Sequence, residues 1–405
     1  MDGGIGPTSS STYNVASHST NPRDGGTDQV FKTINRCLAA MSAGDSCLIR
    51  GSWGSFDGVY DESISLGAYP AGTSIDNRTT IAGYLNENPI MRPTKNAGPY
   101  GYAIVTFSDW DSPNTGAYLQ LSDFTVDMIL APNAPPGIEG EVADCGEINA
   151  SFVLVLRMTC LNAGHDGWVV SGGPAPSPRN QIWRDNVVKD CGRISRSAEN
   201  TKGIGIHISA GTDHLIEGNI IEGCRAGGIA VHQSASLNNV TIRNNVIRQV
   251  GTDSTWPRHP GHSTQVSAGI LVGHGTNFYI SDNLIYNAGS DADPDGADTC
   301  FFSWGDNSAW PDGAFFNNNT CHMGGSATSY GFQTGDGPGA NHVAVNNIFS
   351  SVDVVTDIHF TGAGNSNSDF VTDLIFVDAP NGDYRLCEGL DIATANCTAI
   401  SRAPN

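Results

Sequence analysis

The chain has 405 residues, and its 49 glycines, 20 prolines and 15% charged residues argue against a mainly helical protein, because helices need long charged side chains on their solvated faces. Asp and Glu outnumber Lys and Arg by 41 to 20, which gives a formal net charge of -21. That charge repels phosphate backbones and anionic lipid surfaces, so we expect neither nucleic acid nor membrane as a partner. No run of residues approaches the roughly 18 apolar positions of a membrane span. The first residues lack the apolar core of a signal peptide, so we expect a mature or trimmed form.

The ten cysteines fall into neighbouring pairs along the chain, and none shows the CxxC spacing of a metal site. Disulfides in an oxidising compartment therefore predict a secreted, extracellular protein. The expected pairs are Cys37 with Cys47, Cys145 with Cys160, Cys191 with Cys224, Cys300 with Cys321, and Cys387 with Cys397.

Between residues 67 and 150 the sequence does not fix the register of the repeat: "YLQLSDFTVDM" at 118 to 128 resembles one coil, and "LAPNAPPGIEGE", which follows it, resembles a protruding loop. From about residue 180 the repeat becomes regular. Its copies are "QIWRDNVVKDCG", "HLIEGNIIEGCR", "VTIRNNVIRQVG", "FYISDNLIYNAG", "AFFNNNTCHMGG" and "HVAVNNIFSSV".

One asparagine recurs in these copies at irregular separations of 26 to 38 residues: Asn186, Asn219, Asn245, Asn283, Asn319 and Asn347. A second motif alternates with the first: "GWVVSG", "GIGIHIS", "GGIAVHQ", "GILVGH", "CFFSW" and "GFQTG". Short strands of period-two alternation joined by loops of variable length predict coils that stack through parallel sheets. The asparagines are then expected to form an inward ladder at a corner of the coil.

This pattern resembles the right-handed parallel β-helix of the pectate-lyase-like superfamily, over roughly residues 45 to 380. The segment "GTDQVFKTINRCLAAMSAGDSCLIRGSWGSFDGVYDESISL" is similar to the short capping helix and first strand that open many secreted polysaccharide-processing β-helices. "FVDAPNGDYRL" is similar to their closing segment. The resemblance implies an all-β solenoid at 45–380, preceded by an arm and capping helix at 1–44 and closed by a disulfide-bonded cap at 381–405.

Within the coils, Cys191 and Cys224 each follow a ladder asparagine by five residues, so a disulfide between them would join adjacent coils. Lys189, Glu222 and Arg248 share one outward position and alternate in charge, which predicts a solvated stack of ion pairs.

Alternation also assigns the two histidines of the second motif. Ile204, Ile206 and Ile208 share the core face, which leaves Gly205, His207 and Ser209 outside. In the next coil Ile229 and Val231 point inward and His232 outward. Aligning the motifs gives an exposed outward column of Ser171, His207, His232, Gly273, Trp304 and Gly335. An indole and two imidazoles on one exposed face suggest the floor of a saccharide groove, against the alternative of a ladder without function.

The longest loop near this column, residues 251 to 269, carries Trp256, Arg258, His259 and His262. "RHP" at 258 to 260 matches the start of the RxPxxR pattern of pectate lyases, but Ser263 replaces the final arginine. "GHG" at 273 to 275 matches part of the polygalacturonase signature, whose NTD and DD motifs this chain lacks. Neither partial match identifies a family. His274, Trp256, His259 and Trp304 are nevertheless expected to bind the substrate, because they lie on or near the outward column.

Residues 290 to 299 predict a calcium loop, because carboxylates alternate around a glycine: Asp291, Asp293, Asp295 and Asp298. Such a turn directs several oxygens at one hard cation, although no glutamate follows at the twelfth position. A merely acidic loop is the alternative. We expect no organic cofactor.

These features favour a secreted lyase that cleaves a uronate-containing glycan by β-elimination. His207 or His232 would be the base, and Arg225, Lys202 or Arg258 would neutralise the carboxylate, with calcium assisting. A cluster of basic residues between 184 and 262 would offset the acidic net charge. The alternatives are a glycoside hydrolase or epimerase, with Asp166, Asp213 and Glu217 as candidate carboxylates, and a noncatalytic glycan-binding coil or adhesin. We expect a monomer that binds a polysaccharide.

Overall fold

The computed structural model describes the chain as a series of strands with gaps. The described residues are 12–15, 30–52, 57–68, 70–84, 86–93, 103–105, 117–129, 144–171, 177–192, 203–232, 236–251, 267–288, 298–304, 312–323, 329–334, 342–350, 352, 354–356, 360–361, 366–367, 376–378, 383–391 and 396–399. Only the backbone is described at 12–15, 30, 68, 105, 267, 298, 304, 334, 350 and from 354 onward.

Three parallel sheets account for most of the described strands. The 13-stranded sheet runs β2 (Val30–Phe31), β1 (Thr12–Val15), β3 (Ser46–Ile49), β6 (Thr79–Gly83), β9 (Leu119–Ser122), β12 (Leu154–Leu156), β15 (Ile182–Arg184), β18 (Leu215–Glu217), β21 (Asn238–Arg243), β24 (Thr276–Ser281), β27 (Asp312–Asn317), β30 (His342–Val345) and β33 (Phe360–Thr361).

The 11-stranded sheet runs β34 (Ser366–Asn367), β31 (Ile348–Ser350), β28 (Thr320–His322), β25 (Leu284–Ala288), β22 (Val246–Val250), β19 (Ile220–Glu222), β16 (Val187–Lys189), β13 (Thr159–Leu161), β10 (Thr125–Asp127), β7 (Ile90–Met91) and β4 (Val59–Tyr60). The 10-stranded sheet runs β32 (Val354–Thr356), β29 (Ser329–Thr334), β26 (Asp298–Trp304), β23 (Ser267–Gly273), β20 (Gly227–Val231), β17 (Ile204–Ile208), β14 (Trp168–Val170), β11 (Gly146–Glu147), β8 (Ile104–Val105) and β5 (Ile64–Ser65).

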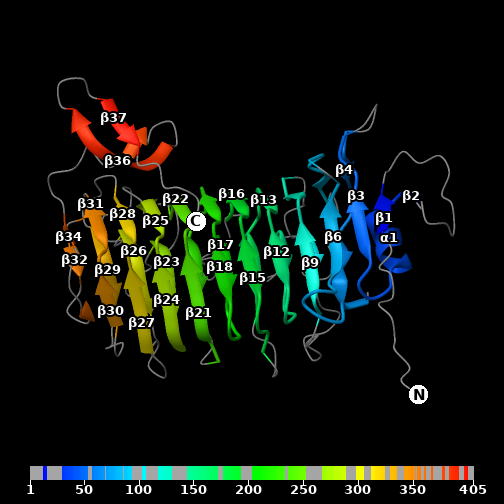
Figure 1. Ribbon diagram of the computed structural model, residues 1–405, viewed down its shortest axis with the longest axis horizontal. Coiled ribbons are helices and arrows are strands. Elements are labelled where there is room, and N and C mark those ends of the chain that lie inside the picture. The colour runs from blue at the N-terminus through cyan, green and yellow to red at the C-terminus, as the bar shows by residue number, and fades with distance from the viewer. Residues whose placement is uncertain are drawn as a thin grey trace, which may run out of the picture.

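Each turn of the chain adds one strand to each sheet, so β17, β18 and β19 form one coil and β20, β21 and β22 form the next. Figure 1 shows these coils stacked along the long axis of the molecule. One coil cannot bury its own apolar residues, but stacked coils share a continuous core. The predicted all-β parallel β-helix is therefore confirmed.

The two ends differ from the coils. Helix α1 (Ile34–Ala40) begins at Thr33, whose hydroxyl accepts the Arg36 N–H, and it lies beside β1 at one end of the coil (Figure 1). The parallel sheet extends back into the predicted N-terminal arm through β1 and β2. A short 3₁₀ helix, η1, covers Leu66–Ala68. Toward the other end, β35 (Phe376–Asp378), β36 (Asp383–Asp391) and β37 (Asn396–Ala399) form an antiparallel sheet. The described residues include no helix long and apolar enough to cross a membrane.

The asparagine ladder forms at the corner between the 13- and 11-stranded sheets. Asn245 is typical: its Oδ1 accepts both the backbone N–H and the Nδ2–H of Asn219, at 2.9 Å each. Its Nδ2 donates to the Ile216 carbonyl at 3.0 Å and to Asn283 Oδ1 at 2.9 Å. The residue before each ladder position has a left-handed φ, which Gly, Asn and Asp tolerate: Asp185, Gly218, Asn244, Asp282, Asn318 and Asn346.

A column of small residues lets the 10-stranded sheet approach the 11-stranded sheet closely. A Cβ added to Gly228 would lie 2.4 Å from Ile247 Cγ2 and 2.5 Å from the Gly269 carbonyl oxygen. The strand register continues this column at both ends into cysteines, Cys145 and Cys300, whose disulfide partners occupy the facing column. At these two positions a disulfide therefore takes the place of the packing of a glycine against an aliphatic side chain.

Four of the five predicted cysteine pairs are disulfides in the structure: Cys37–Cys47, Cys145–Cys160, Cys191–Cys224 and Cys300–Cys321. Cys191 and Cys224 join adjacent coils with their Cα atoms 4.4 Å apart. Cys387 and Cys397 lie on β36 and β37, where only the backbone is described.

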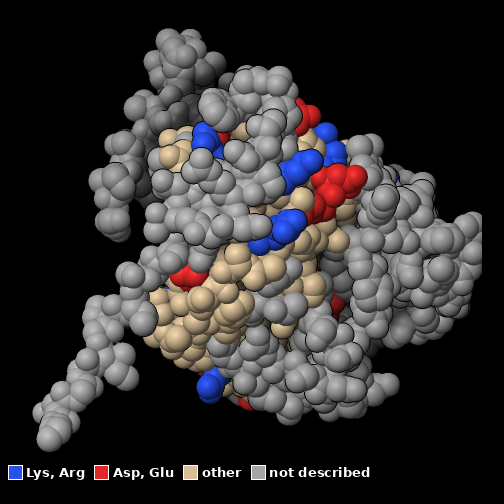
Figure 2. Space-filling view, turned by 90° about the vertical axis from the view of Figure 1, so that its right-hand side faces the viewer, with Lys and Arg blue, Asp and Glu red and all other residues tan. Residues whose placement is uncertain are grey.

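Two ion-pair stacks run across the coils on the outer faces. Glu222 bridges Lys189 and Arg248 at 2.9 Å each on the 11-stranded sheet, which confirms the predicted stack. Glu217 bridges Arg184 at 2.9 Å and Arg243 at 2.7 Å on the 13-stranded sheet. Figure 2, which faces the N-terminal end, likewise shows basic side chains next to acidic ones. These exposed pairs balance charge and add little stability individually.

Candidate functional site

The two histidines of the 10-stranded sheet are neighbours, but their register differs from the predicted one by two residues. His207 on β17 pairs with Ala230 on β20, and the same register, continued by one residue past the strand ends, puts Ser209 opposite His232. The alignment was wrong because Gly205, expected outside, faces the core, where an added Cβ would lie 2.4 Å from Ile221 Cγ2. The rings still stack across the offset, with centroids 4.7 Å apart and planes within 13°.

The prediction of an exposed face is also wrong for His207, which is only 4% exposed. Its column neighbours Val169 and Ala230 are apolar and buried as well. His232 is partly exposed. A buried imidazole on β17 therefore stacks on a more accessible one that follows β20, and the two do not form an open histidine ladder.

A buried carboxylate orients His207. Asp166 precedes β14 by two residues, and stacking of the coils brings it to the start of β17. Its Oδ1 accepts the backbone N–H groups of Gly203 and Ile204 at 2.8 and 2.9 Å, and its Oδ2 lies 2.9 Å from His207 Nδ1. His207 Nε2 lies 3.0 Å from Ser209 Oγ. The three side chains form a chain of hydrogen bonds from carboxylate to imidazole to hydroxyl.

The carboxylate in this chain stays ionised. Burial of Asp166 would raise its pKa, but the charge of His165, the hydrogen bond and charge of His207 and the Ile204 N–H hold that pKa well below its usual range. An ionised Asp166 accepts the proton of Nδ1, which leaves Nε2 as the accepting atom of His207. The imidazole is thus fixed in the tautomer that serves as a base toward Ser209 or a substrate.

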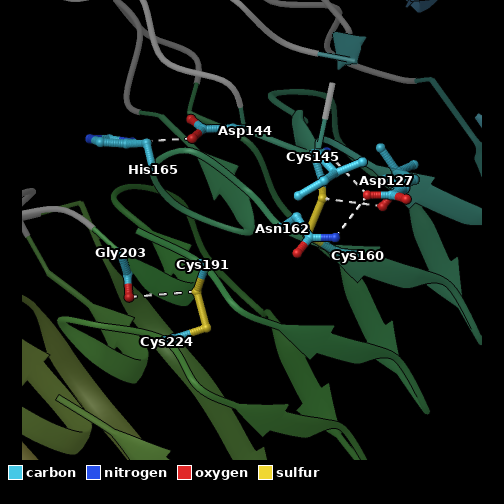
Figure 3. The surroundings of a disulfide bond; sticks show 11 residues. Asp127, Asp144, Cys145, Cys160, Asn162, His165, Cys191, Gly203 and Cys224 are labelled. Atoms are coloured by element: carbon cyan, nitrogen blue, oxygen red, sulfur yellow. Dashed lines mark hydrogen bonds and ion pairs between the residues drawn. A yellow bond between two sulfur atoms is a disulfide. The ribbon is translucent and has the colours of Figure 1, made fainter. Parts of the chain in front are cut away.

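A second histidine adjoins the same carboxylate. His165 Nδ1 lies 3.2 Å from Asp144 Oδ1, an interaction visible in Figure 3, and 3.7 Å from Asp166 Oδ2. Figure 3 also shows the Cys191–Cys224 disulfide close to Gly203, whose carbonyl oxygen lies 3.5 Å from Cys191 Sγ. Because the Gly203 N–H holds Asp166, this disulfide supports the backbone on which the site rests.

The structure brings Arg225 to this region. An added Cβ on Gly203 would lie 3.4 Å from Arg225 Cβ, and the Arg225 N–H donates to the Cys191 carbonyl at 3.1 Å. His274, a predicted substrate-binding residue, is buried in the turn after β23 and has a left-handed φ of 49°.

The backbone of Trp304, another predicted substrate-binding residue, pairs with Gly273. Gly273 continues the column of Ser209 and His232 into the next coil.

The remaining predicted site residues lie outside the described part of the chain: Lys202, Trp256, Arg258, His259, Asp291, Asp293 and Asp295. For Asp298 only the backbone is described, at the start of β26. Among the described residues, no three His, Cys, Asp or Glu side chains form a group that could hold a metal ion. The calcium loop stays a prediction.

The carboxylates considered for hydrolysis are not brought together. Asp166 is fully buried against His207, and Glu217 is held by two arginines on the 13-stranded sheet. Asp213 accepts hydrogen bonds from Asn239 and Thr212, which lower its pKa. A glycosidase needs two carboxyl groups on either side of one bond. These three do not supply such a pair.

Comparisons with known proteins agree with this architecture. A family model described as a right handed beta helix region matches residues 184–372. The structure of an alginate lyase from Paenibacillus sp. str. FPU-7 is similar with a TM-score of 0.56 at 17% identity, over 80% of this chain and 95% of that one. The chain folds as a right-handed parallel β-helix.

Two further solved structures share this β-helix. A GH136 lacto-N-biosidase from Eubacterium ramulus has a TM-score of 0.58 at 14% identity, covering 88% of this chain and 67% of that one. The pectate lyase Pel9A has a TM-score of 0.54 at 15% identity, covering 98% and 94%. No curated protein matches the chain in sequence. Since one fold carries several reactions, the reaction must be argued from the site.

Proposed function

We propose that this β-helix is an extracellular enzyme that cleaves a uronate-containing polysaccharide by β-elimination, with His207 as the base. The observation that carries the proposal is the Asp166–His207 pair on the 10-stranded sheet, at 2.9 Å. The disulfides support an oxidising, extracellular environment. The names of two similar structures, an alginate lyase and a pectate lyase, support a polysaccharide substrate.

Elimination requires removal of the proton next to the uronate carboxyl group, followed by loss of the glycosidic oxygen. A positioned imidazole contributes to such a step when its basic nitrogen reaches the proton. Asp166 keeps Nδ1 protonated, so Nε2 is the atom that takes the proton. In the absence of substrate Ser209 Oγ–H occupies Nε2, and rotation of the serine side chain would free it.

The carboxylate of the substrate must be neutralised as charge develops on it. Arg225, whose Cβ lies near Gly203, is the described basic residue that we propose for this role. Four of the basic residues expected to make the region positive are instead balanced by Glu217 and Glu222 on the other two sheets. The proposal therefore depends on Arg225, together with Lys202, Arg258 or a calcium ion at the 291–298 loop.

Glycoside hydrolysis is the weaker alternative, because its candidate carboxylates are engaged elsewhere. A noncatalytic glycan-binding coil would not need a buried histidine held in one orientation by a carboxylate, as Asp166 holds His207. A purely binding function is therefore also weaker than elimination.

The proposal is tested by incubating the purified protein with a panel of acidic and neutral polysaccharides, with calcium and then with a chelator. Ultraviolet absorbance of the unsaturated uronate reports elimination, and a reducing-end assay reports any cleavage. We expect absorbance to rise on an acidic glycan and to fall when calcium is removed. New reducing ends without that absorbance would indicate hydrolysis. Binding with neither signal would indicate a noncatalytic coil.

A further inference from the structure

Ser209, His207 and Asp166 lie in the order that activates a serine hydroxyl. The hydroxyl is 3.0 Å from His207 Nε2, and His207 Nδ1 is 2.9 Å from Asp166 Oδ2. Asp166 is held by two further backbone N–H groups, so its carboxylate cannot turn away. A nucleophile within hydrogen-bond reach of a base, which a third group orients, is the geometric signature of covalent acyl transfer.

The arrangement arises from coil stacking rather than from a local turn. His207 lies on β17 and Ser209 directly follows its last residue, two positions further along the extended chain, so both side chains point the same way. Asp166 comes from the preceding coil, 41 residues earlier in the chain than His207. If His207 were only structural, any polar partner could satisfy its two ring nitrogens. Instead Nδ1 faces a carboxylate and Nε2 faces a serine hydroxyl, the partners that the histidine of a serine hydrolase has.

We propose that Ser209 is the nucleophile of an esterase site that removes small acyl groups, such as O-acetyl groups, from sugar hydroxyls. The reaction is a second activity at the same imidazole and does not depend on the elimination reaction. A substrate whose ester group lies next to Ser209 would lose its acyl group. A substrate whose acidic C–H lies next to His207 Nε2 would lose its glycosidic bond by elimination.

The proposed reaction has two steps that balance. The Ser209 hydroxyl gives its proton to His207 Nε2 as its Oγ bonds to the acyl carbon, and the ester bond to the sugar oxygen breaks as that oxygen takes the proton from Nε2. Water then attacks the acyl-serine and gives its proton to Nε2. Release of a carboxylic acid returns that proton to Ser209, so the site needs only water as a co-substrate.

Burial defines the size of the acyl group. Ser209 is 7% exposed and His207 is 4% exposed, so a long acyl chain does not fit around the hydroxyl, whereas an acetyl group is small enough to reach it. His232 lies beside Ser209 on the next coil, roughly one strand spacing away. A ring N–H of His232 would be the hydrogen-bond donor to the developing oxyanion.

The test uses the intact protein and two probes, a fluorophosphonate that labels activated serines and p-nitrophenyl acetate as a small ester. Peptide mass spectrometry of the labelled wild-type protein identifies the modified residue. We expect the label on Ser209. Labelling of any other residue, or no labelling together with no ester hydrolysis, overturns the proposal.

Three variants connect the label to the geometry. Ser209→Ala should lower kcat/KM for p-nitrophenyl acetate by about 10³-fold or more, and Ser281→Ala, a matched serine on the 13-stranded sheet, should leave it unchanged. Asp166→Asn tests a positioning role, because it should shift the pH profile of hydrolysis as well as lower the rate. A Ser209→Ala protein that keeps the wild-type rate would show that the serine is not the nucleophile.

The two proposed activities are separable in the same samples. Ser209→Ala removes ester hydrolysis but leaves Nε2 free, so unsaturated uronate should still form from a de-esterified polyuronate. Loss of elimination with intact Ser209 labelling would contradict only the lyase proposal. Elimination by a wild-type protein that neither labels nor hydrolyses esters would contradict only the esterase proposal.

Discussion

His214 makes the stability of this β-helix depend on pH. The residue lies between β17 and β18, is 1% exposed, and its Nε2–H donates to the Ala210 carbonyl at 3.2 Å. Its Nδ1 has no hydrogen-bond partner among the described residues. Burial therefore lowers the pKa of His214 to about 4, although the Ala210 carbonyl and Asp213 act in the opposite direction.

The sign and size of the effect follow from the two pKa values. An unfolded histidine has a pKa of about 6.5, so as the pH falls the unfolded chain takes up the proton first. The stabilisation from neutral His214 is fully present above that pH and is lost as the pH falls toward 4, the folded-state value. Between pH 7 and pH 5 this linkage removes about 2 kcal/mol from the free energy of unfolding.

The substitution His214→Gln isolates this contribution, because glutamine keeps an N–H for the Ala210 carbonyl and does not titrate. Urea unfolding, followed by fluorescence of the buried Trp168 and Trp183, gives the free energy at each pH once refolding curves coincide. The variant should lose about 2 kcal/mol less than the wild type between pH 7 and pH 5. Above pH 7 the difference between the two proteins should be constant, which serves as the internal control. Equal losses in both proteins would refute the reasoning.

Three further substitutions test the coil itself. Asn245→Leu removes four side-chain hydrogen bonds in the buried ladder and should lower the free energy of unfolding by about 3 to 6 kcal/mol in urea titrations. Gly228→Ala places a methyl group 2.4 Å from Ile247 Cγ2 and should cost about 1 to 3 kcal/mol, seen as a lower Tm; an unchanged Tm would show that the column can open. Replacing Cys191 and Cys224 by serine should cost about 2 to 4 kcal/mol and also slow fluorophosphonate labelling, whereas loss of stability without slower labelling would separate this disulfide from the site.

The coil was predictable because its signals are local. A ladder asparagine needs a preceding residue that tolerates a left-handed φ, and the pairs DN, GN and NN supply it in every copy. The cysteine pairs were also accessible, since Cys191 and Cys224 keep the same distance from their ladder asparagines. Each feature lies within a few residues of a ladder asparagine, so the variable length of the loops between coils does not affect it.

The register of the histidines was harder to predict, because "GIGIHIS" contains two glycines and either can be aligned with Gly228. Strict alternation placed Gly205 outside, whereas the close approach of two sheets turns it toward Ile221. An error of two residues preserves the inward and outward faces, so alternation gave no warning. Only the packing between sheets decides the alignment.

The partner of His207 could not be found from sequence spacing. Asp166 was considered as a carboxylate for hydrolysis, and Ser209 only as an outward residue of the same strand. A whole coil, with β14, β15 and β16 and loops of variable length, separates Asp166 from β17, so the spacing between Asp166 and His207 is not encoded in the repeat. One usable signal was the polar residue directly before "GWVVSG", at a position that becomes fully buried.

The most direct test of the proposed function is the rate of unsaturated uronate formation by the wild type and by His207→Ala on the best acidic glycan of the panel. His322→Ala, a partly exposed histidine on the 11-stranded sheet, is the matched control. We predict that His207→Ala lowers the rate by about 10²-fold or more while His322→Ala leaves it unchanged. A wild-type rate in His207→Ala would contradict the assignment of His207 as the base.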